Sequence, residues 1–315
     1  MKKVTVSAPG KLHIAGEHAV VYGKPSLIVA TSLRLYVTLE KSASPSLTTV
    51  RRKDRYIDAI VSVFEKKHGV SVGEEVGITI NSAIPVRSGM GSSAAIAVAL
   101  SGALSVWHGH PWNAQVINET AYQAEKTKHQ NSSGSDPAVA THGGIIWYRK
   151  EMEFLKTLWL LSFQIPKSFA PFVLINTGRV ENTGDLVGHV AQLKQKNEQN
   201  FMRILNEVEV VTKNITKAIH DEQEGEFREA IKENERLLEE MEIVSPDAAS
   251  LIRKIEQTGG VAKISGAGGR AGGAGIILAI HDKPKTLVDL AMQHGYPSFQ
   301  VQLGGDGVKR EQILT

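Results

Sequence analysis

A glycine-rich turn that leads into a long helix of small residues is the feature that most constrains this chain. The turn reads Ser88-Gly89-Met90-Gly91-Ser92-Ser93-Ala94-Ala95, and the run of small residues continues to about Trp107. Such a run predicts a buried helix that packs closely on its neighbours. Glycines let the backbone approach a ligand, and the first N–H groups of a helix can face a phosphate. A capped helix after a tight turn accounts for the same segment equally well.

The composition of the 315 residues is that of a globular protein, with 42% hydrophobic and 22% charged residues. The length predicts two domains. Because the chain has no cysteine, disulfide frameworks, thiolate zinc sites, iron–sulfur clusters and thiol nucleophiles are excluded. The net charge of +3 comes without a run of basic residues, which argues against a nucleic-acid partner. The apolar stretches are too short or too interrupted to span a membrane, so we expect a soluble, cytoplasmic protein.

Hydrophobic periodicity predicts strands and helices in both halves of the chain. Expected strands are 4–8, 33–39, 76–80, 143–148, 172–176, 261–264, 275–280 and 299–303. Expected helices are 57–64, 92–107, 113–128, 185–222 (either continuous or broken), 227–241, 246–258 and 286–295. The first strand is expected to end at the turn residues Pro9-Gly10. Strands with helices on one face predict an α+β fold, and an irregular stretch at 150–167 divides it into domains 1–165 and 166–315.

A second glycine-rich segment, Gly266-Ala267-Gly268-Gly269-Arg270-Ala271-Gly272-Gly273, joins two expected strands. A simple hairpin needs fewer glycines, so this density indicates closure against a ligand or room for backbone from the other domain. A flexible hairpin stays an alternative. Neither glycine segment matches a Walker A motif, and the dinucleotide-binding pattern that begins at Gly89 lacks the acidic residue it needs near position 114.

Four charged side chains and a histidine lie beside loops of this kind. Lys11, Glu17 and His18 follow the first strand, and the apolar run after them would draw the group toward the interior, where an unpaired charge is costly. Glu125 extends the apolar stripe of its helix, so it is expected to need a cation. Asp136 follows the polar loop 131–135, which offers N–H and hydroxyl groups. Their recurrence beside loops suited to phosphate favours a functional site over solvated surface charges.

In order and spacing, these segments resemble the GHMP kinases, the family of galactokinase, homoserine kinase, mevalonate kinase and phosphomevalonate kinase. The resemblance covers essentially the whole chain in three motifs. They are Ala8-Pro9-Gly10-Lys11 with Gly16-Glu17-His18-Ala19-Val20-Val21-Tyr22-Gly23, then Pro85 with Ser88 to Ala95, then Ile264-Ser265-Gly266-Ala267-Gly268-Gly269. Within the family, the run from Gly16 to Gly23 is most similar to the mevalonate kinases.

The resemblance implies an α+β fold of two domains, ribosomal-S5-like at the N-terminus and ferredoxin-like at the C-terminus, with the active site between them. It implies ATP-dependent phosphorylation of a substrate hydroxyl with Mg²⁺, in this case mevalonate to 5-phosphomevalonate in isoprenoid biosynthesis. It also implies a homodimer.

The resemblance assigns roles residue by residue. Asp136 matches the catalytic aspartate and Lys11 the active-site lysine, while Ser93 and Glu125 match the magnesium ligands. Glu17, His18 and Thr183 match positions on the substrate side. The ATP-binding positions are Ser88, Gly89, Met90, Gly91, Ser92 and Ser93, with Gly266 and Gly268 from the third motif.

Two departures from the family pattern bear on the substrate. Gly184 stands where related kinases usually carry lysine after the Ser/Thr pair, and Arg270-Ala271 interrupts the third glycine run. Kinases for phosphomevalonate, for the 3-hydroxyl of mevalonate or for homoserine therefore stay alternatives, as does a GHMP-fold sensor without turnover. The presence of Lys11, Glu125 and Asp136 together argues against the sensor.

Overall fold

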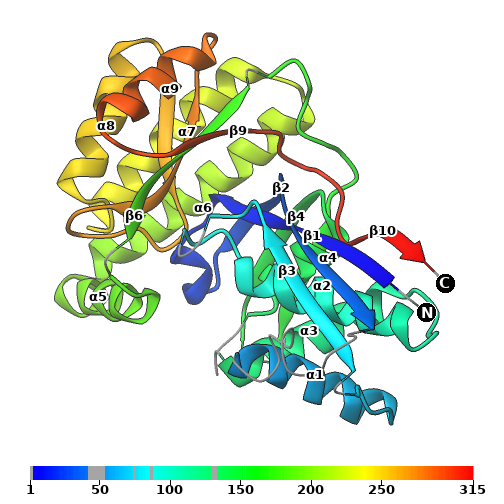
Figure 1. The fold of residues 1–315 in the computed structure, drawn as a ribbon. Helices are drawn as coiled ribbons and strands as arrows, with labels where there is room; N and C mark the ends of the chain where they lie inside the picture. Colours follow the sequence, from blue (N-terminus) through cyan, green and yellow to red (C-terminus); the bar gives the residue numbers. More distant parts are fainter. Residues whose placement is uncertain are drawn as a thin grey trace.

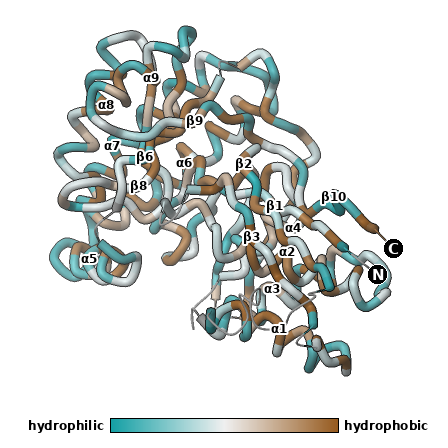
Figure 2. The backbone as a smooth tube through the Cα atoms, in the orientation of Figure 1, coloured by the Kyte–Doolittle hydropathy of each residue, from teal (hydrophilic) through white to brown (hydrophobic). Residues whose placement is uncertain are grey.

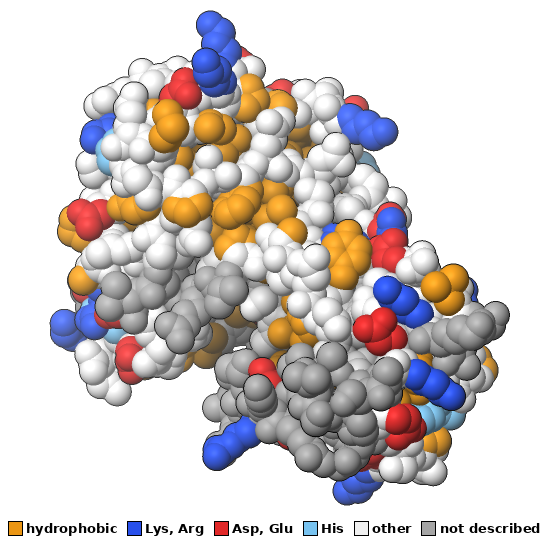
Figure 3. All heavy atoms as spheres, viewed as in Figure 1, with side chains coloured by type: hydrophobic (Ala, Val, Ile, Leu, Met, Phe, Trp, Pro, Cys, Tyr) orange, Lys and Arg blue, Asp and Glu red, His pale blue; other side chains and the backbone are white. Residues whose placement is uncertain are grey.

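The computed structural model describes residues 3–41, 54–73, 75–85, 88–128, 133–152, 154–169, 171–179 and 181–314. Figure 1 shows two lobes side by side, the first built from the first half of the chain and the second from most of the remainder. Hydrophobic residues gather along the strands and on the helix faces that lie against them (Figure 2). On the face shown in Figure 3, the surface is indented between the two lobes.

The first lobe is built on an antiparallel sheet. Its strands are β1 (Lys3–Ala15), β2 (Pro25–Lys41), β3 (Val76–Ser82), β4 (Ile145–Lys150), β5 (Lys156–Leu160) and β10 (Lys309–Leu314). Their order is β10-β1-β2-β4-β5, and β3 also pairs with β2. On the side away from β1, the long strand β2 pairs with two strands: its first residues pair with β4 and its last residues pair with β3.

In the described part of the first lobe, the sheet is accompanied by the helices α1 (Arg55–His68), α2 (Ser92–Trp107), α3 (Ala114–Lys128) and α4 (Ser135–His142). Helix α2 packs on β1, β2 and α3, and every residue from 97 to 106 is buried. The prediction of a buried helix of small residues is therefore confirmed. Its central position places the preceding glycine turn over the middle of the sheet.

The second lobe has an antiparallel sheet of its own, in the order β7 (Val261–Ser265), β8 (Ala274–Ile280), β6 (Phe172–Arg179) and β9 (Ser298–Val301). Its helices are α5 (Thr183–Lys196), α6 (Glu198–His220), α7 (Glu224–Glu240), α8 (Pro246–Gln257) and α9 (Pro284–Gln293). Helices α7 and α8 pack on β7, and α9 packs on β6, β8 and β9. Of the two alternatives for 185–222, the broken helix is confirmed, with the break at Asn197, between α5 and α6.

The segment that follows β1 joins the two lobes. It contains the 3₁₀ helix η1 (Ala19–Tyr22). The ring of Tyr22 packs edge to face on that of Phe201 on α6, with 4.9 Å between the ring centroids. Two residues further on, Lys24 Nζ lies 3.0 Å from Glu209 Oε2, also on α6. Both contacts fix this segment of the first lobe against the second.

The last strand returns to the first lobe. Strand β10 pairs with β1 in a register that sets Lys3 opposite Leu314. The Arg34 guanidinium on β2 donates to the backbone oxygens of Asp306 and Gly307, at 2.8 and 2.7 Å, which fixes the approach to β10. The division of the chain into 1–165 and 166–315 stays a prediction, and residues 309–314 contribute to the first sheet from the far end of the sequence.

The expectation that the first strand ends at Pro9-Gly10 is wrong. Strand β1 continues to Ala15, and a register shift between Pro9 and Lys11 absorbs the irregularity. A bulge of this kind lets a strand bend without ending, so turn-forming residues do not always mark its limit. The stretch 150–167 was expected to be irregular but contains β5. Among the described residues, no helix is both long and apolar enough to cross a membrane.

Candidate active site

Lys11 and Asp136 form an ion pair between β1 and α4 of the first lobe. Strand β1 supplies Lys11, and the first turn of α4 supplies Asp136, whose Oδ1 lies 3.4 Å from Lys11 Nζ. The lysine side chain is 9% exposed and the aspartate side chain 32% exposed. The carboxylate is therefore held in place by a buried cation and still reaches solvent, as a group that must meet a substrate requires.

The glycine turn that contains Gly91, the second of the three family motifs, packs against the Lys11–Asp136 pair. Gly91 precedes α2 with φ at +71°, and a Cβ at this position would lie 2.9 Å from Lys11 Cγ and 3.6 Å from Asp136 Oδ2. The backbone N–H of Lys11 donates to the Met90 carbonyl at 3.0 Å, and the Met90 side chain is buried. The first and second motifs, far apart in sequence, thus form one site at the start of α2.

Ser93 and Glu125 meet beside the same helix start. Ser93 Oγ on α2 donates to Glu125 Oε1 on α3 at 3.0 Å, and Glu125 is buried. Tyr56 on α1 donates from its hydroxyl to the Ser93 carbonyl at 3.3 Å. Burial, with Glu125 nearby, raises the pKa of Tyr56 far above its ordinary value and keeps it a neutral donor. No local sequence pattern marks Tyr56 as a site residue, because it lies on an ordinary amphipathic helix.

The Ser93–Glu125 contact fits a magnesium site. Mg²⁺ takes oxygen ligands, retains several waters, and is usually bound by one or two carboxylates together with substrate phosphates. One hydroxyl and one carboxylate in contact at a helix N-terminus supply the protein's share of such a set. Within the described residues, no cluster of three or more His, Cys, Asp or Glu side chains could hold a metal alone. Waters and phosphate oxygens would complete the coordination.

Glu17 and His18 lie at the junction of the lobes. Glu17 is buried, and its Oε1 pairs with the Nζ of Lys263 on β7. His18 Nε2 lies 2.9 Å from the carbonyl oxygen of Ala267, in the third motif. Burial lowers the pKa of His18, so its imidazole is neutral near pH 7. Both residues were expected on the substrate side, and both are held by the second lobe.

The third motif splits into packed and open glycines. A Cβ at Gly268 would lie 2.1 Å from the Ile243 carbonyl oxygen, so this glycine is needed for close backbone packing inside the second lobe. A Cβ at Gly266 would meet nothing within 4 Å. Of the two glycines of this motif that are predicted to bind ATP, Gly266 has open space at its Cβ position, and Gly268 is packed against the Ile243 backbone.

Thr183 is the exposed first residue of α5, next to a charged cluster. The cluster links Glu181 to Arg270 of the third motif, through the Arg270 backbone N–H at 2.6 Å and its guanidinium at 2.8 Å. The hydrogen bond from the Arg270 backbone N–H, together with the Arg270 guanidinium, lowers the pKa of Glu181. Arg270 therefore ties the third glycine loop to the turn that carries Thr183. Asn131 and Ser132 of the polar loop before Asp136 lie outside the described residues.

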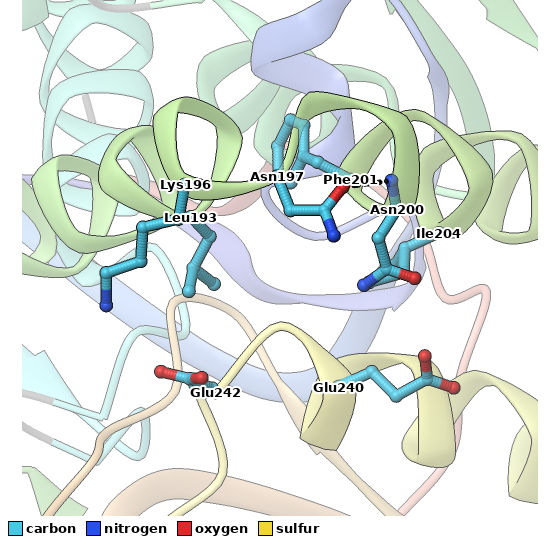
Figure 4. Close-up of a pocket in the computed structure, with 8 residues that line it drawn as sticks. All are labelled: Leu193, Lys196, Asn197, Asn200, Phe201, Ile204, Glu240 and Glu242. Carbon is cyan, nitrogen blue, oxygen red and sulfur yellow. Dashed lines mark hydrogen bonds between the residues drawn. The ribbon is translucent and has the colours of Figure 1, made fainter.

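A cavity of about 210 Å³ lies in the second lobe, where α5 meets α6 and α7 ends (Figure 4). Its lining residues are Leu193, Lys196, Asn197, Asn200, Phe201, Ile204, Glu240 and Glu242. Glu242 is also paired with His189, whose other ring nitrogen lies 3.2 Å from Arg270. None of the predicted site residues lines this cavity, so it is separate from the Lys11–Asp136 site.

Comparison with known proteins gives the same class of enzyme as the fold and the site. The family model of the GHMP kinase N-terminal domain matches residues 55–144. A mevalonate kinase from Archaeoglobus fulgidus is 30% identical over 313 residues, covering 97% of this chain and 99% of its own. The chain therefore belongs to the GHMP kinase family and is an ATP-dependent kinase.

The similar proteins also include other mevalonate kinases. The one from Thermococcus sibiricus is 28% identical over 350 residues and covers 99% of both chains. The solved structure of L. major mevalonate kinase in complex with R-mevalonate superposes with a TM-score of 0.81, at 21% identity and 95% coverage of both chains. Streptococcus pneumoniae phosphomevalonate kinase gives a TM-score of 0.75 at 19% identity, covering 96% of this chain and 100% of its own.

Proposed function

We propose that this enzyme transfers the γ-phosphate of ATP to the 5-hydroxyl of mevalonate. The observation that carries the proposal is the Lys11–Asp136 pair, which lies against Gly91 at the start of α2. It sets a partly exposed carboxylate and a buried cation beside a helix N-terminus suited to phosphate. The choice of mevalonate is supported by relatives of this name that match the chain over nearly its full length.

In the proposed mechanism, Asp136 acts as the base and Lys11 as the neighbouring cation. As the 5-hydroxyl oxygen attacks the γ-phosphorus, the Asp136 carboxylate accepts the hydroxyl proton, and the bond to the bridging oxygen breaks to release ADP. The Lys11 ammonium holds the carboxylate in place and offsets negative charge near the transferred group. The N–H groups at the start of α2 bind the phosphates.

Ser93 and Glu125 would hold Mg²⁺, which when bound neutralises phosphate charge. The hydrogen bond from Ser93 Oγ to Glu125 Oε1 fixes the positions of both oxygens before any ligand arrives. Tyr56 supports this arrangement, because its hydroxyl donates to the Ser93 backbone and restrains the first turn of α2. These residues therefore fix the positions of the side-chain oxygens that would bind Mg²⁺.

A coupled assay of ADP release over a panel of hydroxylated substrates tests the proposal. We expect release that depends on mevalonate and Mg²⁺, and NMR of the product should show the phosphate on carbon 5. Activity on phosphomevalonate, homoserine or galactose, but not on mevalonate, would falsify the choice of substrate. A phosphate on the 3-hydroxyl would change the site of transfer and keep the enzyme class.

The proposal extends to the assembly and location of the protein. The family resemblance supports a homodimer in the cytoplasm that acts without nucleic acid. Size-exclusion chromatography with light scattering measures the mass directly, and a mass of 34.2 kDa, that of a single chain, would overturn the dimer.

A further inference from the structure

A buried ion pair joins the second lobe to the turn that carries His18. Lys263 lies in the middle of β7 and is fully buried, and its Nζ contacts Glu17 Oε1 and donates to the Ile264 carbonyl at 2.7 Å. The Glu17 side chain is 1% exposed. Because Glu17 is almost fully buried and paired with Lys263, we look for its role in the residues that it holds in place.

Glu17 is the carboxylate that balances the charge of Lys263. The other acidic group nearby, Glu235 on α7, accepts the Ile264 backbone N–H at 2.9 Å. Burial raises the pKa of Glu235 to about 8, so this group is mainly neutral at pH 7. Removing one partner of a buried ion pair leaves an uncompensated charge, which is strongly unfavourable. The Lys263–Glu17 contact is therefore fixed by charge as well as by packing.

His18, the residue after Glu17, has a backbone conformation that is unfavourable for a residue other than glycine. His18 has φ at 52°, in the left-handed region that side chains other than glycine seldom adopt. Two contacts offset this cost, the Glu17–Lys263 pair and the bond from His18 to the Ala267 carbonyl. Because Lys263 and Ala267 belong to β7 and the loop that follows it, the same part of the second lobe fixes both residues of the turn.

The Ala267 contact also sets the tautomer of His18. A carbonyl oxygen can only accept, so Nε2 carries the proton, and in the neutral ring Nδ1 is then a hydrogen-bond acceptor. An acceptor of this kind suits a substrate hydroxyl rather than a carboxylate. His18 is therefore equipped to bind the hydroxyl-bearing part of a substrate, provided that the ring keeps this position.

We propose that Lys263, acting through Glu17, is a positioning residue that holds His18 for the hydroxylated substrate. The inference rests on the proposed function for the identity of that substrate. Of the residues predicted on the nucleotide side, Lys11, Ser93, Glu125 and Asp136 lie on β1, α2, α3 and α4, and Gly266 directly follows β7. Loss of the ion pair should therefore change the affinity for the hydroxylated substrate more than the affinity for ATP.

The test compares the wild type with Lys263→Gln and with the double variant Glu17→Gln, Lys263→Gln. The single variant should raise the KM for mevalonate by about tenfold and change the KM for ATP by less than about twofold. The double variant replaces the ion pair by two neutral amides that can hydrogen-bond to each other, and should return the KM to within about threefold of the wild type. Lys24→Gln, which removes another ion pair between the lobes, is the matched control and should leave both KM values unchanged.

The outcomes separate this inference from the proposed function. Equal changes in both KM values for Lys263→Gln, or no change, would overturn the positioning role. A double variant no better than the single one would overturn the role of the ion pair. If Lys263→Gln fails to fold, a folded double variant with a near-normal KM supports the proposal, and an unfolded one overturns it. If the wild type does not phosphorylate mevalonate, the proposed function fails, and the same comparison is made with the substrate that it does phosphorylate.

Discussion

Replacing Gly91 with alanine would place one methyl group between the two motifs that form the site. The added Cβ would lie 2.9 Å from Lys11 Cγ and 3.3 Å from Lys11 Cε. Carbon atoms in good contact are about 3.5–4.0 Å apart, so the Lys11 side chain must move by about 0.6 Å or more. Asp136 Oδ2, at 3.6 Å from the same Cβ, limits the directions that are open to it.

Two effects of this substitution can be separated in magnitude. The left-handed backbone of Gly91, with φ at +71°, costs an alanine roughly 1–2 kcal/mol of stability. The displacement of Lys11 disturbs the ion pair with Asp136, and misplacement of a catalytic group by about 1 Å can cost about 100-fold in rate. We therefore expect kcat for Gly91→Ala to fall by about 10-fold to 100-fold.

Gly109→Ala provides the matched control. Gly109 follows α2 with φ at +73°, and a Cβ there would meet nothing within 4 Å. Both variants should lose about the same free energy of unfolding in urea, and only Gly91→Ala should lose activity in the coupled ADP assay. If kcat for Gly91→Ala stays within about twofold of that for Gly109→Ala, the exact placement of Lys11 does not control the rate, and our account of the site is refuted.

Three further predictions concern single carboxyl groups. Asp136→Asn should lower kcat by about 100-fold to 10,000-fold and leave ATP affinity, measured by calorimetry, nearly unchanged; unaltered turnover would remove Asp136 from its proposed role. Glu125→Gln should raise the Mg²⁺ concentration for half-maximal activity by about tenfold, and an unchanged Mg²⁺ dependence would exclude Glu125 as a ligand. Glu235→Gln should flatten the pH dependence of stability. The pKa of Glu235 is raised to about 8 in the folded protein, so its favourable contribution is complete below the unfolded value of about 4.3 and is lost as the pH rises through 8. Between pH 6.5 and 8 the wild type should lose up to about 2 kcal/mol more than the variant in urea unfolding, and equal losses would contradict the assignment.

The elements and residues with a strong local signal were predictable from the sequence. The small residues of α2 indicated a buried helix, and the structure has one over the expected range. Lys11, Ser93, Glu125 and Asp136 were selected because charges or hydroxyls lay beside glycine turns or an apolar stripe. The structure brings them together in two contacts, Lys11 with Asp136 and Ser93 with Glu125. Their catalytic and metal-binding roles stay predictions.

Local sequence patterns could not predict which residues and strands pair over long distances in the sequence. Lys263 lies within an apolar strand, and nothing in its neighbourhood indicates that its partner is Glu17, 246 residues earlier. Strand β10 consists of exposed residues without alternation and exists because β1 offers a free edge. Strand β5, half exposed at the other edge of that sheet, has the same origin.

The return of β10 to the first sheet has a consequence for how the enzyme is made. A ribosome synthesises β1 before the second lobe and β10 after it, so the first lobe cannot be completed until the second lobe has been made. During that interval the outer edge of β1 lacks its partner, and Arg34 lacks the carbonyl groups of Asp306 and Gly307. A fragment cut at residue 165 would have the same defect permanently, and supplying residues 302–314 as a separate peptide is the direct way to repair it.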